Sequence, residues 1–150
     1  MTIEEAIKQK KRFDNEFVRA QVNLVYTASR LNHALLRDLK KFGITTQQYN
    51  ILRILKGRHP EPMTVKDLAA RMIDKTSNAS RLVDRLVNKN YVIRELCESD
   101  RRRVDVVITE KGIEFVKNIS TTLDKHIDER FKNMTLEEAE LLNSLLDKLK

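Results

Sequence analysis

The sequence predicts a mostly helical (α+β) chain that carries a single β-hairpin. Only 3 of its 150 residues are glycine and 2 are proline, which favours long helices. Apolar residues recur at steps of three and four over most of the chain, which is the period of a helix. Two β-prone segments, 91–95 and 104–108, flank a polar loop over 96–103, which is typical of a hairpin.

The N-terminal segment predicts a long helix with an apolar stripe. Thr2-x-x-Glu5 is a capping box, so this helix is expected to begin at about residue 3 and to end at about Lys41, before Gly43, with a break near 14–15. A stripe of this length needs cover from a partner chain or from another long helix. Its members are Phe13, Phe17, Ala20, Leu24, Ala28, Leu31 and Leu35.

Three shorter helices are expected in the middle of the chain, over about 46–57, 64–72 and 76–89. A tight connection over 73–75 joins the last two. Asn90 follows the last of them, and asparagine tolerates the left-handed conformation that is common after a helix.

The hairpin and two further helices complete the pattern. Thr109 is expected to cap a helix that follows the hairpin, and the capping box Thr135-x-x-Glu138 opens the final one. A short helix, a tight turn, a second helix and then a hairpin form the arrangement of a winged helix-turn-helix. We therefore expect a winged-helix part over 45–112, with dimerisation helices over 1–42 and 113–150.

The charge distribution favours an anionic partner for the first two thirds of the chain. The net charge is +7, and it divides into +4 over residues 1–50, +5 over 51–112 and −2 over 113–150. A basic protein of this size commonly binds a polyanion such as DNA. The alternative is a solvated surface whose charge serves solubility, and composition alone does not decide between them.

The predicted helix over 76–89 has one apolar face and one face suited to reading DNA. Each helical residue advances about 100°, which gathers Ser77, Asn78, Arg81 and Arg85 on one side. Arginine can bond guanine, and asparagine can bond adenine, through two hydrogen bonds each. Asp84, on the rim of this face, is expected to restrain Arg81 or Arg85. The alternative is an ordinary amphipathic helix, and only the preceding helix and the following hairpin favour a recognition helix.

Two stretches carry a resemblance to a known family. One is 68–72 together with 80–92, and the other is 100–112, where an Asp-x-Arg is followed by a strand and then by Ile-Thr-x-x-Gly. In both, the sequence resembles the MarR family of bacterial winged-helix regulators, although Asn90 stands where the family often has glycine. The resemblance implies an obligate homodimer on a palindromic operator, with interlocking outer helices. Many members are repressors released by small phenolic or anionic ligands, or by thiol oxidation.

The resemblance and the residue chemistry together predict the DNA contacts. The resemblance implies that Arg102 enters the minor groove, steadied by Asp100. We expect the bases to be read by Ser77, Asn78, Ser80 and Arg81, and the DNA backbone to be contacted by Thr64, Lys75, Thr76, Arg85, Arg101 and Arg103.

Tyr26 and Arg30 form the one candidate effector site in the sequence. They lie four residues apart on the first long helix, so a phenol and a guanidinium share one face. Such a pair could hold a small anionic or phenolic effector. The alternative, which we favour, is structural: Arg30 pairs with an acid, and Tyr26 packs at an interface.

No motif for catalysis, a metal or a cofactor is present. His33, His59 and His126 are scattered, and no phosphate loop, nucleophile elbow or paired-carboxylate signature occurs. Cys97 lies in the predicted hairpin loop near Arg94 and is best interpreted as a bystander, with a redox role as the alternative. We expect a protein that is not an enzyme and that uses no cofactor.

The remaining expectations concern compartment and class. The chain has no apolar run that could span a membrane and no export signal, so the cytoplasm is the expected compartment.

The leading hypothesis is a dimeric, sequence-specific DNA-binding transcription regulator, a repressor relieved by a small ligand. The rival hypothesis is a protein–protein interaction module on a winged-helix scaffold, which would not need the arginines of the predicted recognition helix and hairpin.

Overall fold

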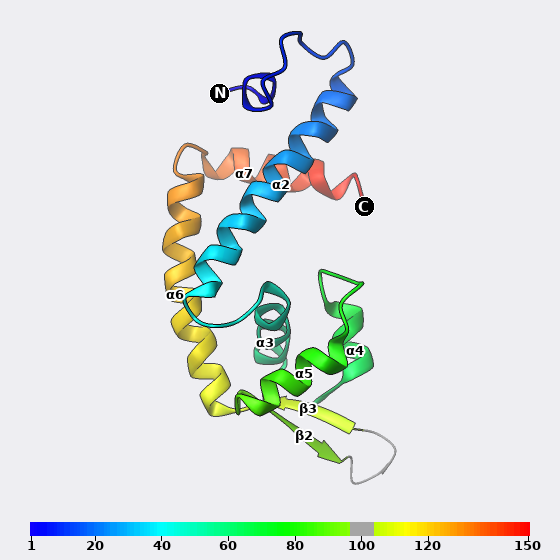
Figure 1. Ribbon diagram of the computed structural model, residues 1–150, viewed down its shortest axis with the longest axis vertical. Coiled ribbons are helices and arrows are strands. Elements are labelled where there is room, and N and C mark those ends of the chain that lie inside the picture. The colour runs from blue at the N-terminus through cyan, green and yellow to red at the C-terminus, as the bar shows by residue number, and fades with distance from the viewer. Residues whose placement is uncertain (97–103) are drawn as a thin grey trace. The chain divides into compact units, whose positions relative to one another are not determined.

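The computed structural model describes residues 1–96 and 104–150, which divide into two compact units, Met1–Thr46 and Gln47–Lys150 (Figure 1). The described residues are mostly helical, with one small antiparallel sheet, so the predicted fold class is confirmed. In chain order the elements are α1 (Ile3–Ala6), α2 (Glu16–Lys40), α3 (Thr46–Arg58), β1 (Met63–Thr64), α4 (Val65–Arg71), α5 (Ala79–Asn88), β2 (Val92–Leu96), β3 (Val104–Ile108), α6 (Glu110–Phe131) and α7 (Leu136–Asp147).

The first unit contains a short helix and a long one instead of one continuous helix. The capping box at Thr2 is present, but α1 ends at Ala6, and Lys8 adopts a left-handed conformation at φ 57°. The long helix starts afresh at Glu16, because the side chain of Asn15 accepts the N–H groups of the next turn at 2.8 and 3.3 Å. The expected break is therefore confirmed, while the predicted helix over 7–14 is wrong.

An ion pair joins the two helices of the first unit. Arg19 on α2 lies 2.7 Å from Glu4 on α1 and 3.4 Å from Glu16. The hydrogen bond from Arg19 is the main cause that lowers the pKa of Glu4 to about 2. This contact holds α1 against α2 together with the buried side chain of Ile3.

The second unit is built on a three-stranded antiparallel sheet in the order β1-β3-β2. The hairpin of β2 and β3 follows the predicted segments closely, whereas the two-residue strand β1 is too short for a sequence pattern to reveal. Helices α3, α4 and α5 and the start of α6 supply the rest of the core (Figure 1). Its fully buried side chains include Ile51, Leu52, Leu55, Leu68, Met72, Val83, Leu86, Val92, Val106, Val116 and Ile119.

Helix α5 begins three residues later than predicted, at Ala79 instead of Thr76. The carboxylate of Asp74 accepts both the N–H of Thr76, at 3.0 Å, and its hydroxyl, at 2.7 Å. This local turn competes with helical geometry over 74–76. The side chain of Asn78 then caps the helix by accepting the N–H of Arg81 at 3.1 Å.

One junction ties the hairpin to α6. Asn90 adopts the expected left-handed conformation, at φ 61°. The hydroxyl of Thr109 donates to the Asn90 carbonyl at 2.8 Å and accepts the N–H of Gly112 at 3.0 Å, so one side chain both closes the loop and caps α6. A Cβ at Gly112 would collide with the Tyr91 carbonyl and would lie 2.8 Å from Ile108 Cγ1. The Ile-Thr-x-x-Gly pattern is therefore a packing requirement.

The helices outside the winged part keep much apolar surface exposed. Helix α7, which opens on the predicted capping box, has no buried residue, and Leu136, Leu141 and Leu145 are all at least half exposed. On α2, Phe17 is 87% exposed. None of the helices in the described part of the chain is both long and apolar enough to cross a membrane.

Replacing Gly112 by alanine is expected to destabilise the second unit by about 1–3 kcal/mol, the usual cost of forcing an atom into a packed site. Urea denaturation followed by circular dichroism measures this change. Gly57, in α3, has open space where its Cβ would lie, so Gly57→Ala is the matched control and should instead stabilise by up to about 1 kcal/mol. Equal effects of the two substitutions would contradict the assigned role of Gly112.

Arg19→Gln should raise the pKa of Glu4 from about 2 toward its ordinary value of 4.5, because the guanidinium that favours the carboxylate is gone. In the parent, the contribution of this pair to stability is present above about pH 4.5 and is lost as the pH falls toward 2. A carboxyl-carbon NMR titration measures the pKa directly. Identical titrations of Glu4 in the two proteins would show that Arg19 is not the cause.

Candidate nucleic-acid interface

The buried side of α5 determines which of its residues face outward. Ala79, Val83 and Leu86 are buried in the core of the second unit, as the predicted wheel requires. The polar residues of the helix, Ser80, Arg81 and Arg85, are consequently exposed. The amphipathic pattern of the sequence therefore translates directly into an inner face and an outer face.

The two outward arginines, Arg81 and Arg85, are available for an external ligand. Within the part of the chain that the structure describes, neither guanidinium has a hydrogen-bond or ion-pair partner. Arg58 and Arg94 of the same unit, by contrast, are each paired with a carboxylate at 2.8 Å. Two exposed guanidinium groups one turn apart present fixed positive charge along the outer face of α5.

Ser77 and Asn78 precede α5 instead of lying within it. Ser77 is half-buried in the turn, and Asn78 is the N-cap, with its side-chain oxygen bonded to the Arg81 N–H. The amide nitrogen of Asn78 remains available as a hydrogen-bond donor, whereas the capping oxygen is already engaged. Of the residues predicted to read bases, only Ser80 and Arg81 thus lie in the first turn of the helix.

Three residues predicted to contact the DNA backbone also make structural bonds, Thr64 at the beginning of α4 and Lys75 and Thr76 in the turn between α4 and α5. Thr64 caps α4, and its hydroxyl lies 2.7 Å from an oxygen of Asp67. The Lys75 ammonium donates to the Ala70 carbonyl, and Thr76 is bonded to Asp74. The hydrogen bond from the Thr76 hydroxyl is the main cause that lowers the pKa of Asp74.

The turn between α4 and α5 is also anchored to α3. The N–H of Ile73 donates to the side-chain oxygen of Asn50 at 2.9 Å, while the Ile73 side chain is 87% exposed. This bond fixes the beginning of the turn, just after α4, against α3. The sequence pattern did not indicate Asn50, because its partner is 23 residues away along the chain.

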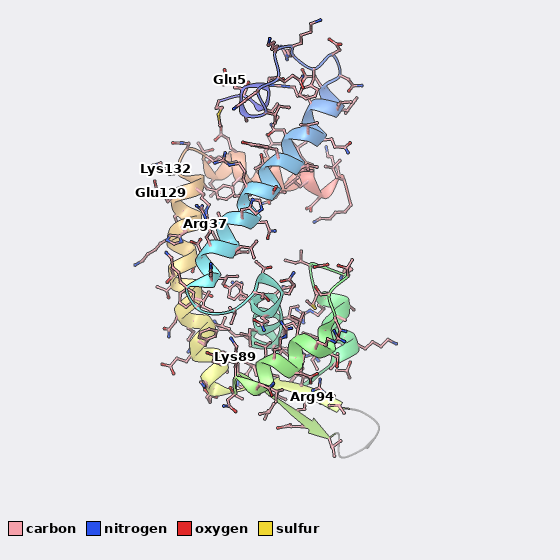
Figure 2. The ribbon with its side chains drawn as sticks, in the orientation of Figure 1. Glu5, Arg37, Lys89, Arg94, Glu129 and Lys132 are labelled. Atoms are coloured by element: carbon pink, nitrogen blue, oxygen red, sulfur yellow. The ribbon has the colours of Figure 1, made fainter. Side chains whose placement is uncertain are left out.

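Asp84 pairs with Arg94 on β2, so the expectation that it restrains Arg81 or Arg85 is wrong. The carboxylate lies 2.8 Å from the Arg94 guanidinium, which also lies 3.4 Å from both the carbonyl and the hydroxyl oxygen of Ser80. Figure 2 labels Arg94 on the hairpin beside α5. Sequence reasoning missed this role. The strand alternation could have indicated it. Arg94 is two residues beyond the buried Val92, so both side chains lie on the same face of β2.

The tip of the hairpin lies outside the described residues. Cys97 falls there, as do Asp100 and Arg102, predicted for the minor groove, and Arg101 and Arg103, predicted for the backbone. The described base of the hairpin pairs Leu96 with Val104 and Val92 with Ile108.

The candidate effector residues lie together on α2. Arg30 donates to the Tyr26 hydroxyl at 3.1 Å and lies 5.8 Å from the centre of the Tyr26 ring, and no ion pair of Arg30 with an acid occurs within residues 1–96 and 104–150. Tyr26 also lines a mostly apolar groove of about 600 Å³ within the first unit. The other lining residues are Ile7, Val18, Gln21, Val22, Val25 and Ser29.

No cluster of three or more histidine, cysteine or acidic side chains suited to a metal ion occurs among residues 1–96 and 104–150. The outward face of α5, beside the hairpin, is thus the candidate site with the clearest chemistry.

Comparison with known proteins places the chain in a family. Residues 42–103 match the family model described as the MarR family. The HTH-type transcriptional regulator SarZ of Staphylococcus epidermidis is 30% identical over 104 residues, covering 69% of this chain and 68% of that protein. Among solved structures, the MarR family regulator AbsC from Streptomyces coelicolor aligns with a TM-score of 0.75 and 29% identity, covering 93% of this chain and 95% of that one.

The crystal structure of the S. aureus MepR–DNA complex shares the fold, with a TM-score of 0.73 at 21% identity over 86% of this chain and 92% of that one. The family consists of transcription regulators, so the expectation that the protein is not an enzyme is confirmed. The winged helix, its Thr-x-x-Gly junction and these likenesses together establish that the chain belongs to the MarR family of transcription regulators.

Proposed function

We propose that this regulator binds a palindromic operator as a homodimer and represses transcription until a small ligand releases it. The observation that carries the proposal is the outer face of α5, where Arg81 and Arg85 are exposed and have no partner among the described residues. A buried apolar face on the opposite side of α5 fixes the side of the helix from which these two arginines extend. A DNA duplex is the partner whose regular negative charge and base edges match such a face.

Within this proposal, the start of α5 enters the major groove. Arg81 and Ser80 read bases from the first turn, and Asn78 contributes its amide nitrogen. Ser77, at the turn, completes this set. Arg85 contacts a phosphate one turn further along, and Thr64, Lys75 and Thr76 meet the backbone while keeping their internal bonds. The fold shared with MepR, which was crystallised with DNA, supports this docking.

The hairpin is proposed to reach the minor groove. Arg102 inserts there because a narrow groove in A·T-rich DNA concentrates negative potential, and Asp100 directs the guanidinium. Arg101 and Arg103 meet the flanking phosphates. These assignments rest on the sequence and on the family resemblance, since all four residues lie outside the described part of the chain.

The dimer is proposed to form through residues 1–42 and 113–150, while 45–112 binds DNA. Support comes from α7, which has no buried residue although it carries leucines along its length, and from the exposed Phe17 on α2. Apolar surface of this extent on a small chain marks an interface. A two-fold dimer places two copies of α5 about 34 Å apart, one turn of DNA.

The releasing ligand is proposed to be a small anionic or phenolic molecule held near Tyr26 and Arg30. The adjacent apolar groove and the exposed guanidinium supply the two kinds of contact that such a ligand needs. A regulator of this kind acts in the cytoplasm, where the DNA is.

The test of the proposed function is selection of duplexes from a random-sequence pool by the purified protein, followed by binding measurements with salt titrated. We expect one palindromic sequence to be enriched. The protein should bind it about 10³-fold or more tightly than a scrambled duplex. A protein that binds all duplexes equally, or none, would contradict it.

Arg81→Ala should weaken binding to the selected duplex by about 1–3 kcal/mol, the size of a lost bidentate base contact, and should weaken binding to a scrambled duplex less. Arg85→Ala should act differently, lowering the salt slope by about one unit on both duplexes. Fluorescence anisotropy measures all four affinities. Equal losses on both duplexes for Arg81→Ala would identify Arg81 as a phosphate contact.

Sedimentation at low micromolar concentration should give twice the chain mass of 17.6 kDa. Leu145→Glu should weaken the dimer about tenfold or more, because burying one leucine contributes about 1.5–3 kcal/mol. Ile73→Glu is the matched control, since Ile73 is exposed but lies in the winged part, and it should leave the mass unchanged. A monomeric parent protein would exclude the proposed dimer.

A further inference from the structure

Arg94 joins the exposed part of β2 to the outer face of α5. Its guanidinium lies 2.8 Å from the carboxylate of Asp84 and 3.4 Å from both oxygen atoms of Ser80. Ser80 and Asp84 are one helical turn apart and therefore lie on the same side of α5. One side chain on the hairpin thus spans the turn of α5 that carries Arg81.

At this height the core holds the hairpin through β3, whose Val106 and Asp105 are buried opposite Arg94 and Glu95, while β2 itself is exposed. β2 is an edge strand, because β3 lies between it and β1, and β1 pairs only with Val106 and Asp105. Val92 is buried, but every later residue of β2 is exposed, so the core does not hold this part of the strand directly. The ladder with β3 places β2, and the Arg94 contacts, which are polar and directional, add a direct link from the exposed part of β2 to α5.

The electrostatics of the pair also suit a DNA-binding face. A bare carboxylate at Asp84, beside Arg81 and Arg85, would repel phosphates, and the guanidinium of Arg94 offsets that charge. The two side chains are 35% and 56% exposed, and ion pairs exposed to this extent add little to folding stability. The effect of the pair should therefore appear in DNA binding and not in the melting temperature.

We propose that Arg94 is a positioning residue for DNA recognition: through Asp84 and Ser80 it holds the exposed part of β2 against α5, so that both elements meet one operator in register. This inference rests on the proposed function and adds residues that the DNA need not touch. The competing explanation is that Arg94 is simply another phosphate contact. If Arg94 acts by positioning, specific binding also needs its partner Asp84. If Arg94 contacts a phosphate, specific binding does not need Asp84.

The experiment measures the specificity ratio, which is the affinity for the duplex selected by the parent protein divided by the affinity for a scrambled duplex. Arg94→Ala and Asp84→Asn should each lower this ratio about tenfold, and the double variant should lower it no further, because coupled residues are not additive. Arg94→Lys keeps a charge that can reach Asp84 and should recover part of the ratio.

Arg58→Ala is the matched control, because Arg58 forms an exposed ion pair with Glu61 at the same 2.8 Å distance but away from α5. It should leave the specificity ratio unchanged. All variants should melt within a few degrees of the parent, and Arg94→Lys and Asp84→Asn keep the test valid if Arg94→Ala folds poorly.

Two results would overturn the inference while the parent protein still binds its selected duplex. The first is an Arg94→Ala variant that loses affinity equally for both duplexes, as a phosphate contact does. The second is an Asp84→Asn variant whose specificity ratio is unchanged or higher. A parent protein without any preferred duplex would instead overturn the proposed function, and this inference with it.

Discussion

The one-sided burial of α5 is the constraint on which the interface depends. Val83 and Leu86 are fully buried, and this fixes the rotation of the helix about its own axis. Because side chains are about 100° apart along a helix, that rotation leaves Arg81 and Arg85 outside. Any change that rotates α5 would cost buried apolar surface, so the hydrophobic core fixes the side of the helix from which the two arginines extend.

The hairpin is held at two levels by different kinds of interaction. At its base, the Thr109 side chain, the left-handed Asn90 and the absence of a Cβ at Gly112 form a tightly packed junction with α6. Further along, where β2 is exposed, the polar contacts of Arg94 join that strand to α5. Packing thus sets where the hairpin begins, and a charged side chain contributes to the direction in which it continues.

The winged part and the helices outside it differ in how much of their apolar surface they bury within this chain. The winged part buries many of its leucines, isoleucines and valines in one core, whereas α7 buries none and α2 leaves Phe17 and Val25 exposed. This contrast has a physical origin, since a single amphipathic helix cannot cover its own stripe. The proposed dimer would cover these exposed surfaces with a second copy of the chain.

The sequence by itself determined the features that depend on near neighbours. Capping boxes at Thr2 and Thr135, the cap at Thr109, the inner face of α5 and the strands of the hairpin were all predictable, because each depends on residues only a few positions apart. Three features were decided only by the tertiary structure. They are strand β1, which exists only because β3 lies beside it, the bond from Ile73 to Asn50, and the pairing of Asp84 with Arg94 in place of its helix neighbours. The physical reason is common to all three: a hydrogen bond or an ion pair goes to whichever group the fold brings nearest, and sequence spacing does not reveal that group.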